Sequence, residues 1–454
     1  MGRSSPYSKG SKNFSQSRWK TAIPHFVREI LLRLRNGGHE VYIVGGAVRD
    51  LFLVRPLRDW DLATSASVHE MAALFKDLRF FLLKGDTITL VHERDRFEVT
   101  PFRGQGHGPC SLEKDLSHRD FTIDAMAYDE EKGRVLDPFG GRIDLEKRRV
   151  KAVGVPHDRF LEDPLRLLRG IRIATELGFA VESKTLKSIG RMANRIEGSA
   201  LERIREELSK ILISGKPSSG FQLLRKTGLL KIVLPELLEG YGRRQNGYHR
   251  YTVYKHTLLT VDLIQNDLVL RWAALLHDIA KVRVGVKVDG HCRFWGHERA
   301  SAALAEEILK RLKVSGAMAS HITHLIAHHM IGYRREWTDA TVRRWVKRIG
   351  DAFQNDLFAL RRADILAHGI DHDGEILLSE LAKRAAEVMA QSPPLRRAGL
   401  ALDGNQIMKI LDLEPGPKVG EALEALLEKV IEDPALNSKD SLLAILKKEK
   451  EKGL

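Results

Sequence analysis

Cysteine is almost absent from this chain, and so are long apolar stretches. Only Cys110 and Cys292 occur among the 454 residues, far apart, which excludes a disulfide framework and a cysteine-rich zinc site. No apolar run reaches the length of a transmembrane helix, and the N-terminal segment lacks the apolar core of a secretory signal. We therefore expect a cytoplasmic protein with no membrane partner.

Acidic residues are missing from residues 1–22, which are rich in Ser and carry several Lys and Arg residues. This composition predicts a disordered basic tail, with a transit peptide as the alternative interpretation. The whole chain has a formal net charge of +14, which favours a polyanionic partner. Because no segment is suited to a membrane, nucleic acid is the partner that we expect.

Hydrophobic patterning changes along the chain. Short β-branched runs separated by helical stretches and Gly-rich turns predict an α/β head, and beyond it long amphipathic runs predict helices almost throughout. A chain of this length should divide into several parts. The predicted parts are a tail (1–22), an α/β head with a small mixed sheet (23–150), an all-α neck (151–240), a helical body (241–370) and a helical tail (371–454).

A Gly-Gly pair precedes two closely spaced aspartates in the head. Residues 41–44 predict a buried strand, Gly45 and Gly46 allow backbone amides to approach a phosphate, and a helix carrying Arg49 follows. Asp59 and Asp61 lie in a second predicted strand, on one face, where they could hold one or two Mg²⁺ ions. This arrangement suits metal-dependent nucleotidyl transfer.

An Asp-x-Asp triplet alone is a weak signal, because a chain of this length contains such triplets by chance. Glu98 in a third predicted strand adds a further carboxylate to the ordered set. After that strand, Arg119 could bind a triphosphate and Asp120 a ribose, although an isolated Arg-Asp pair is more often a surface ion pair.

A predicted helix begins near Pro164 and carries the pair Asp163 and Arg166. The two residues are three apart, so they would share a helical face and offer an acceptor and a fork of donors to the Watson–Crick edge of a base. The simpler interpretation is an ordinary ion pair. Four further arginines are candidate phosphate contacts: Arg148, Arg149, Arg169 and Arg172.

Histidine and aspartate recur through the predicted helical body. His277 and Asp278 end an apolar helix, where buried polar groups require partners. A divalent transition metal would be such a partner, with water as a nucleophile for hydrolysis. The candidate ligands are His256, His277, Asp278 and Asp364, with His297 and His329 as additional candidates.

Together, these ordered motifs resemble the bacterial class II tRNA nucleotidyltransferase and poly(A) polymerase family, in its long form with an HD domain. Later segments take part in the resemblance: Leu201-Glu202-Arg203-Ile204, Asp403-Gly404-Asn405-Gln406 and Pro415-Gly416-Pro417. The resemblance implies a nucleotidyltransferase head, a neck that selects the base, an HD body and a tRNA-binding tail.

The resemblance also implies the chemistry. Asp59, Asp61 and Glu98 would be catalytic, with Mg²⁺, CTP, ATP and tRNA as cofactor and partners. The nucleotide-binding residues would be Gly45, Gly46, Arg49, Arg119, Asp120, Asp163, Arg166 and Arg169, and Arg203 would join the RNA-binding residues. The HD body would be a metal-dependent phosphohydrolase.

Several positions depart from the family pattern. His118 stands where the family usually has Arg, and Asp124 where it usually has Asn. The Gly-rich span between Arg103 and Arg119 is shorter than in CCA-adding relatives and resembles CC-adding members. A CC-adding subtype, with a separate A-adding enzyme acting afterwards, is therefore one hypothesis. The alternatives are a poly(A) polymerase acting on general RNA and an RNA-binding HD phosphohydrolase with an inactive head.

Overall fold

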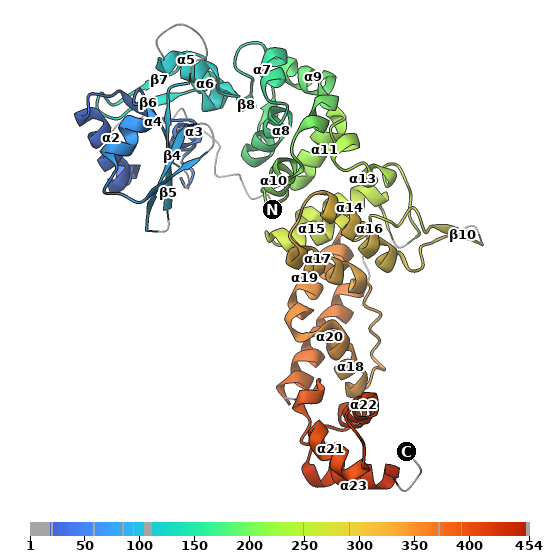
Figure 1. Ribbon diagram of the computed structural model, residues 1–454. Coiled ribbons are helices and arrows are strands. Elements are labelled where there is room, and N and C mark those ends of the chain that lie inside the picture. The colour runs from blue at the N-terminus through green and yellow to red at the C-terminus, as the bar shows by residue number, and fades with distance from the viewer. Residues whose placement is uncertain are drawn as a thin grey trace. The chain divides into compact units, whose positions relative to one another are not determined.

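The computed structural model contains two compact units, Met1–Val233 and Leu234–Leu454 (Figure 1). The structure describes residues 19, 21–57, 60–83, 86–93, 95–103, 111–247, 249–289, 291–370, 373–391 and 393–450. None of the described helices combines the length and the apolar character that a bilayer crossing requires. The five-part division expected from the sequence stays a prediction at its inner boundaries.

The head is built on a seven-stranded mixed sheet in the order β3-β4-β5-β2-β1-β6-β7. Strands β2 and β5 are parallel, whereas the other neighbouring strands are antiparallel. This confirms the predicted mixed α/β head. The strands are β1 (Val41–Val44), β2 (Trp60–Thr64), β3 (Phe80–Leu83), β4 (Thr87–His92), β5 (Asp95–Pro101), β6 (Ala127–Asp129) and β7 (Arg134–Leu136).

Helices cover both faces of this sheet. Helix α2 buries Phe26, whose ring lies 5.0 Å from that of Phe97 on β5. Leu112 and Leu116 of α5 pack against the other face, on Val44 and Ala63. The head helices are α2 (His25–Asn36), α3 (Gly46–Leu53), α4 (Val68–Leu74), α5 (Leu112–Ser117), the 3₁₀ turn η1 (Thr122–Asp124) and α6 (Gly141–Glu146).

The predicted tail requires a correction at its C-terminal end. Trp19 is only 4% exposed, and its ring packs edge-on against Phe52 and Tyr128 at 4.8 and 4.9 Å. Burying an aromatic ring of this size stabilises the fold, so order begins before residue 23. The prediction weighed charge and Ser content and overlooked this single aromatic anchor. Residues 1–18 and Lys20 lie outside the described part of the chain.

The neck is helical, as predicted, apart from a two-residue parallel pair of strands, β8 (Arg149–Val150) and β9 (Ala180–Val181). It packs tightly on the head, because a Cβ at Gly170 would lie 3.0 Å from the ring of the fully buried Phe121. Its helices are α7 (Pro156–Glu162), α8 (Arg166–Leu177), α9 (Ser183–Arg191), η2 (Ala193–Gly198), α10 (Leu201–Leu212), α11 (Pro217–Thr227) and α12 (Leu230–Val233).

The second unit is helical except for an exposed hairpin, β10 (Val286–Val288) and β11 (His291–Arg293). Trp272 in its first part is fully buried. Its helices are α13 (Glu236–Glu239), α14 (Val253–Leu263), α15 (Leu268–Leu276), α16 (His297–Arg311), α17 (Gly316–His328), α18 (Asp339–Ile349) and α19 (Gln354–Ala367), then α20 (Gly374–Ala390), α21 (Gly404–Leu411), α22 (Pro417–Glu432) and α23 (Lys439–Lys450), with 3₁₀ turns η3 (Asp351–Phe353), η4 (Arg397–Gly399) and η5 (Pro434–Leu436).

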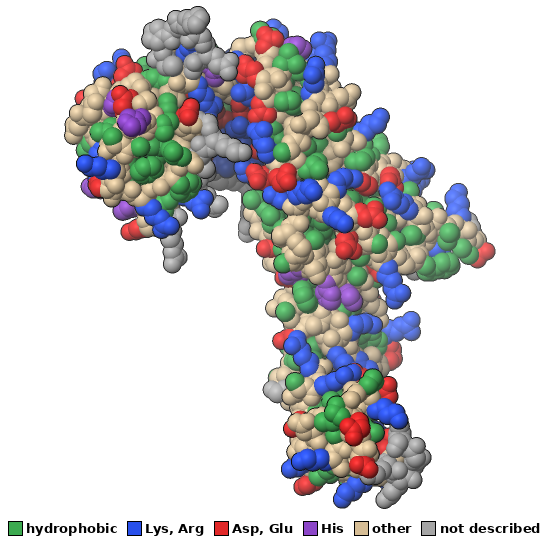
Figure 2. Space-filling model, in the orientation of Figure 1, with side chains coloured by type: hydrophobic (Ala, Val, Ile, Leu, Met, Phe, Trp, Pro, Cys, Tyr) green, Lys and Arg blue, Asp and Glu red, His purple; other side chains and the backbone are tan. Residues whose placement is uncertain are grey.

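The C-terminal helices form a small core of their own. Ile407, Val430 and Leu442 are fully buried within it. Helix α22 is attached to α18 by ion pairs, among them Lys347 with Glu424 at 2.6 Å. On the face in Figure 2, Lys and Arg side chains are spread over both units and interleaved with Asp and Glu, so the positive charge on this face is carried by many separate sites.

Candidate active site

Two carboxylates of the head lie directly opposite each other on neighbouring strands. The parallel pairing of β2 with β5 sets Asp61 against Glu98, and Val44 of β1 is the partner of Asp61 on its other side. Paired residues of adjacent strands point to the same face of a sheet. Asp61 is half-buried and Glu98 is exposed, so oxygen ligands of the kind that Mg²⁺ prefers stand together there. Asp59, the third predicted catalytic carboxylate, lies outside the described residues.

Gly45 brings a cation and a carboxylate close to its backbone. It follows β1 with a φ of 72°, a conformation that favours glycine. A Cβ at this position would lie 2.7 Å from Nη1 of Arg119 and 3.1 Å from Oδ2 of Asp61. The absence of a side chain therefore lets these two groups converge, and Gly46 opens helix α3 beside them.

Arg49 and Arg119 are both held by carboxylates of the head. Arg49 forms ion pairs with Asp50 at 3.0 Å and Asp124 at 2.6 Å, so the aspartate that departs from the family pattern holds a predicted nucleotide-binding arginine. Burial alone would lower the pKa of Arg49, but these two carboxylates raise it. Arg119 lies 3.3 Å from the buried Asp115. Both guanidinium groups are charged and positioned near Gly45 or the helix that follows it.

The predicted base-selecting pair does not share a helical face. Asp163 follows helix α7, and α8 begins only at Arg166, since Asp163 to Leu165 form the turn between the helices. This corrects the expectation that the helix starts near Pro164. Asp163 Oδ1 accepts a hydrogen bond from the amide of Leu165 at 3.0 Å, and Oδ2 pairs with Arg203 at 2.8 Å. Arg203, predicted to bind RNA, therefore positions Asp163.

Arg166 is held by groups from both head and neck. Its Nε lies 2.6 Å from Asp120, its Nη1 donates to Glu162 at 2.6 Å, and its Nη2 donates to the carbonyl of His118 at 3.2 Å. Arg169 contacts the same Asp120 at 2.9 Å. Asp120, predicted to hold a ribose, thus connects the head to two arginines of the neck. For Arg166 to read a base, it must exchange part of these contacts.

The other three arginines predicted to bind RNA each contact a different kind of neighbour in the structure. Arg172 lies 2.6 Å from Glu207 and 2.7 Å from Glu176 and is only 14% exposed. This placement favours a structural link between α8 and α10 over a phosphate contact. Arg149 pairs with Asp144, and the guanidinium of Arg148 lies 5.3 Å from the ring centre of Phe179.

All six predicted ligands of the helical body converge in its interior. They come from helix α14, the C-terminal ends of α15 and α17, the start of α16, and α19, and each is less than 10% exposed. His256 Nε2 lies 3.0 Å from Asp364 Oδ1, and His277 Nε2 lies 3.4 Å from Asp278 Oδ2. The six residues brought together are His256, His277, Asp278, His297, His329 and Asp364.

The imidazoles are oriented as metal ligands are. In His256, His277, His297 and His329, the Nδ1 atom lies 2.7 to 3.2 Å from a backbone carbonyl. Because Nδ1 then carries a proton, Nε2 is the nitrogen that faces the carboxylates and that a metal would bind. Asp278 Oδ1 and His297 Nε2 lie 3.3 Å apart and have no hydrogen-bond partner among the described residues. Two buried acceptors that face each other in this way fit a shared cation.

Protonation of the cluster follows its charges. Burial lowers the pKa of His277, but Asp278 and Asp364 raise it to about 10. Burial and the neighbouring His277 lower the pKa of His329 to about 3. Lys281, at 2.8 Å, also pairs with Asp278. A divalent cation could take the place of the proton on His277 between the same two carboxylates.

Sequence reasoning missed four residues of this cluster. His368 lies 3.4 Å from Asp364, and His249 approaches both His368 and His256. The spacing of Asp364 and His368, four residues apart at the C-terminal end of α19, was a readable signal, because residues four apart on a helical turn lie on the same side. His249 has no such signal. The missed residues are His249, Lys281, Arg361 and His368.

Comparison with known proteins connects these features. The "Poly A polymerase head domain" family matches residues 41–151, "Probable RNA and SrmB- binding site of polymerase A" matches 178–240, and "tRNA nucleotidyltransferase domain 2 putative" matches 299–446.

Individual relatives match nearly the whole chain. An A-adding tRNA nucleotidyltransferase of Deinococcus radiodurans is 35% identical over 410 residues, which cover 85% of this chain and 90% of the relative. A CC-adding tRNA nucleotidyltransferase of Thermus thermophilus is 33% identical, covering 86% and 89%. The crystal structure of the Bacillus stearothermophilus CCA-adding enzyme in complex with CTP matches with a TM-score of 0.71 at 27% identity, covering 94% of this chain and 97% of that one. The extent of these matches shows that the chain belongs to the tRNA nucleotidyltransferase family, a family of enzymes.

Proposed function

We propose that this protein adds cytidine, with adenosine as the second candidate nucleotide, to the 3′ end of tRNA without a nucleic-acid template, and that pyrophosphate is released. The observation that supports this most directly is the pairing of Asp61 with Glu98 beside Gly45 and Arg119. The names of the relatives point to the same class of reaction, since they include A-adding, CC-adding and CCA-adding enzymes.

Asp61 and Glu98, together with Asp59, would hold Mg²⁺ in the head. The same-face placement of Asp61 and Glu98 on β2 and β5 fits this donor set. Bound Mg²⁺ would supply positive charge that activates the 3′-hydroxyl and neutralises the triphosphate, as in a two-metal mechanism. Arg119 would bind the triphosphate, and the missing side chain of Gly45 leaves room for its guanidinium.

Base choice would rest on Asp163 and Arg166 in the neck. Arg203 fixes the carboxylate of Asp163, and Asp120 fixes the guanidinium of Arg166. Burial would raise the pKa of Asp163, but the hydrogen bond from Arg203 and the amide of Leu165 lower it, so the carboxylate stays an acceptor. An amino group of a base could donate to it, while Arg166 donates to a ring nitrogen or carbonyl.

The product is decided by supplying purified protein with tRNA that ends at the discriminator base, at C or at CC, and with each nucleoside triphosphate separately. We expect CTP to be incorporated on the first two substrates. Incorporation of CTP together with addition of A to tRNA ending in CC defines a CCA-adding enzyme, incorporation of CTP alone defines the CC-adding subtype, and addition of A without incorporation of CTP defines an A-adding enzyme. Extension of unstructured RNA by ATP alone would replace the proposal with a poly(A) polymerase.

The CC-adding hypothesis depended on the short span before Arg119, and residues 104–110 of that span lie outside the described residues. Two of the relatives, at 35% and 33% identity, are named for partial addition, of A and of CC. This keeps a partial product, completed by a separate enzyme, among the proposed outcomes. The two cysteines, far apart in the sequence, suit the reducing cytoplasm in which we expect the protein to act.

We further propose a metal-dependent phosphohydrolase activity in the helical body, because its buried His and Asp cluster is oriented for a divalent transition metal. RNA with a 2′,3′-cyclic phosphate end is the first substrate to test. His329→Ala should abolish hydrolysis, whereas the neighbouring His328→Ala is the matched control. Persistence of hydrolysis in the His329 variant would contradict the site. If Asp61→Ala leaves CTP incorporation unchanged, the assignment of Asp61 as a Mg²⁺ ligand of the head is wrong. If the wild-type protein incorporates no nucleotide but hydrolyses RNA, the alternative of an RNA-binding phosphohydrolase with an inactive head holds.

A further inference from the structure

The helical body contains more metal-ligand atoms than one ion can use. Three overlapping groups of three ligands lie around His277 and Asp278, and a fourth group, which shares His256 with one of them, consists of His249, His256 and His368. Within each group, the ligand atoms lie within 4.8 Å of one another. We call His249, His256 and His368 the outer triad, and the remaining ligands, His277, Asp278, His297, His329 and Asp364, the inner cluster.

The two sets can be filled independently. A single Nε2 atom can bind one ion only, so His256 must belong to one set or the other. Without His256, the inner cluster still contains two complete groups: His277 with His329 and Asp364, and Asp278 with His297 and His329. Assigning His256 to the outer triad therefore leaves enough ligands for an inner ion.

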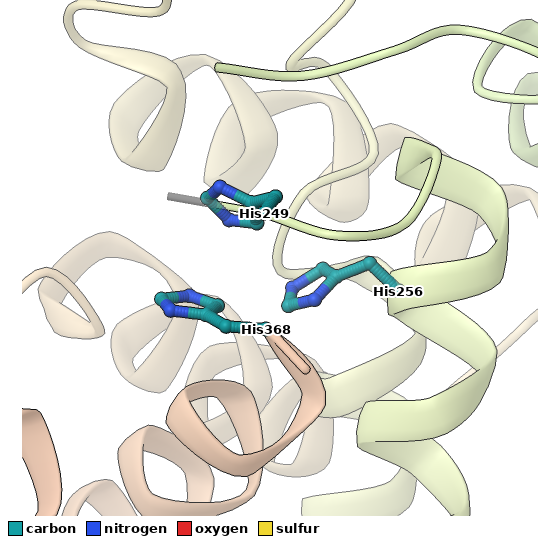
Figure 3. Close-up of side chains that lie close together, drawn as sticks. All are labelled: His249, His256 and His368. Carbon is teal, nitrogen blue, oxygen red and sulfur yellow. The ribbon is translucent and has the colours of Figure 1, made fainter. Parts of the chain in front are cut away.

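The three imidazoles of the outer triad face a common space, as Figure 3 shows. Their ring centres are separated by 4.2 Å between His249 and His368, 5.1 Å between His249 and His256, and 5.5 Å between His256 and His368. His256 is fully buried and His368 is 8% exposed, whereas His249 is half-buried. The triad therefore lies at the more accessible side of the cluster.

We propose that the outer triad binds a second divalent transition-metal ion, separate from the ion of the inner cluster, with zinc as the favoured metal. This extends the proposed metal-dependent function of the helical body and rests on it for a catalytic role, although occupancy of the triad can be measured without any activity. Three imidazoles and an open position are the donor set of many catalytic zinc sites. Imidazole also favours zinc over Mg²⁺, which prefers oxygen ligands.

The surrounding structure holds the triad in this arrangement. His249 Nδ1 lies 2.8 Å from Asn246 Oδ1, and His256 Nδ1 lies 3.2 Å from the carbonyl of Ala367, so in both residues Nε2 is the nitrogen left to bind an ion. The Nε2 of His249 now lies 3.5 Å from the Lys281 ammonium, which an ion would displace from it. The amide of Arg250 donates to the carbonyl of His368 at 2.9 Å, which fixes the segment of His249 against the end of α19.

Two neighbouring charged groups act on an ion in this position: the carboxylate of Asp364 favours it, and the ammonium of Lys281 opposes it. Asp364 Oδ1 lies 3.0 Å from His256 Nε2 and 3.4 Å from His368 Nε2, so one carboxylate oxygen contacts both. Lys281 Nζ lies 3.5 Å from His249 Nε2 and 2.8 Å from Asp278, which offsets its charge. The ammonium group is placed to donate to an anion held at the open position, such as a phosphate oxygen.

The test is the zinc content of the purified full-length chain after removal of metal and reconstitution with zinc in excess Mg²⁺. Every variant carries Asp61→Asn, so that the carboxylates of the head do not add to the count. We expect about two zinc ions per chain, and about one in His249→Ala and in His368→Ala, because a site that loses one of three imidazoles binds weakly. His329→Ala should also retain about one, in the outer triad. His291→Ala, which removes an exposed histidine of β11, should retain both.

Cobalt substitution provides a second measurement, because the visible absorption of Co²⁺ reports its ligands. The second equivalent of Co²⁺ should change the spectrum of the parent chain but not that of His249→Gln, a milder change in a residue outside any helix. Zinc content in both outer variants equal to that of the parent chain would overturn the proposal. A parent chain that holds two ions but hydrolyses nothing would support it while removing the phosphohydrolase function. A parent chain that binds a single ion, and whose hydrolysis is unaffected by His249→Ala, would overturn the second metal site while supporting the phosphohydrolase function.

Discussion

Replacing Gly45 with alanine should disable nucleotide transfer while leaving the protein folded. The new Cβ would stand 2.7 Å from Nη1 of Arg119, whereas a comfortable contact is about 3.5 Å. The guanidinium must therefore move by about 1 Å, and a misplacement of that size can lower a rate about 100-fold. The same Cβ would lie 3.1 Å from Asp61, so the carboxylate is disturbed as well.

The substitution also has a structural cost, which a control can separate. A non-glycine residue at φ of 72° and ψ of −137° is strained by about 1–3 kcal/mol. Gly38 has a φ of 85°, but a Cβ there would meet nothing within 4 Å, so Gly38→Ala introduces backbone strain without blocking the site. Both variants should lose stability, whereas only Gly45→Ala should lose most of its activity.

The assay compares initial rates of CTP incorporation into tRNA with the free energy of unfolding in urea. We expect Gly45→Ala to be slower by about 100-fold and Gly38→Ala to remain near wild type. Equal rates in the two alanine variants would refute the inference that Gly45 is needed for the approach of Arg119 to Asp61.

Three other predictions concern different parts of the chain. Asp61→Asn and Glu98→Gln should each reduce CTP incorporation by at least about 100-fold with little change in tRNA affinity, because each removes the charge of a proposed metal ligand. A normal rate in either variant would exclude that residue as a ligand. Arg166→Ala should impair the choice between CTP and other triphosphates more than RNA binding, since it removes the donors that we propose to read the base. Competition between labelled nucleotides measures this choice, and an unchanged preference for CTP would contradict the templating role. Burial would raise the pKa of Glu236, but the Arg311 guanidinium lowers it below its ordinary value of 4.5. The pair therefore stabilises the fold above pH 4.5, and this stabilisation is lost as the pH falls through the lower pKa of the folded state. Arg311→Met should therefore flatten the acid dependence of the unfolding free energy by about 1 kcal/mol, and an unaltered slope in urea titrations would show that the pair contributes nothing.

Local patterns in the sequence determined much of this protein. Alternation along a strand set Asp61 on one face and marked Glu98 as a carboxylate of a neighbouring strand, because side chains of a strand alternate regardless of context. The polar pair His277 and Asp278 at the end of an apolar helix required buried partners, and the cluster supplies them. The mainly helical character of the second unit was readable for the same reason, since amphipathic periodicity is local; the hairpin of β10 and β11 was not predicted.

Only the tertiary structure decided which distant residues meet. The parallel register of Asp61 with Glu98, the burial of Trp19 and the approach of His249 to His368 each depend on how separate elements pack, which no local period encodes. The same holds for Arg172, which the sequence presented as a cation for RNA and the fold places between two glutamates. A buried arginine requires an oppositely charged partner because burial removes its contact with water. Packing, and not the neighbouring sequence, decides which carboxylate becomes that partner.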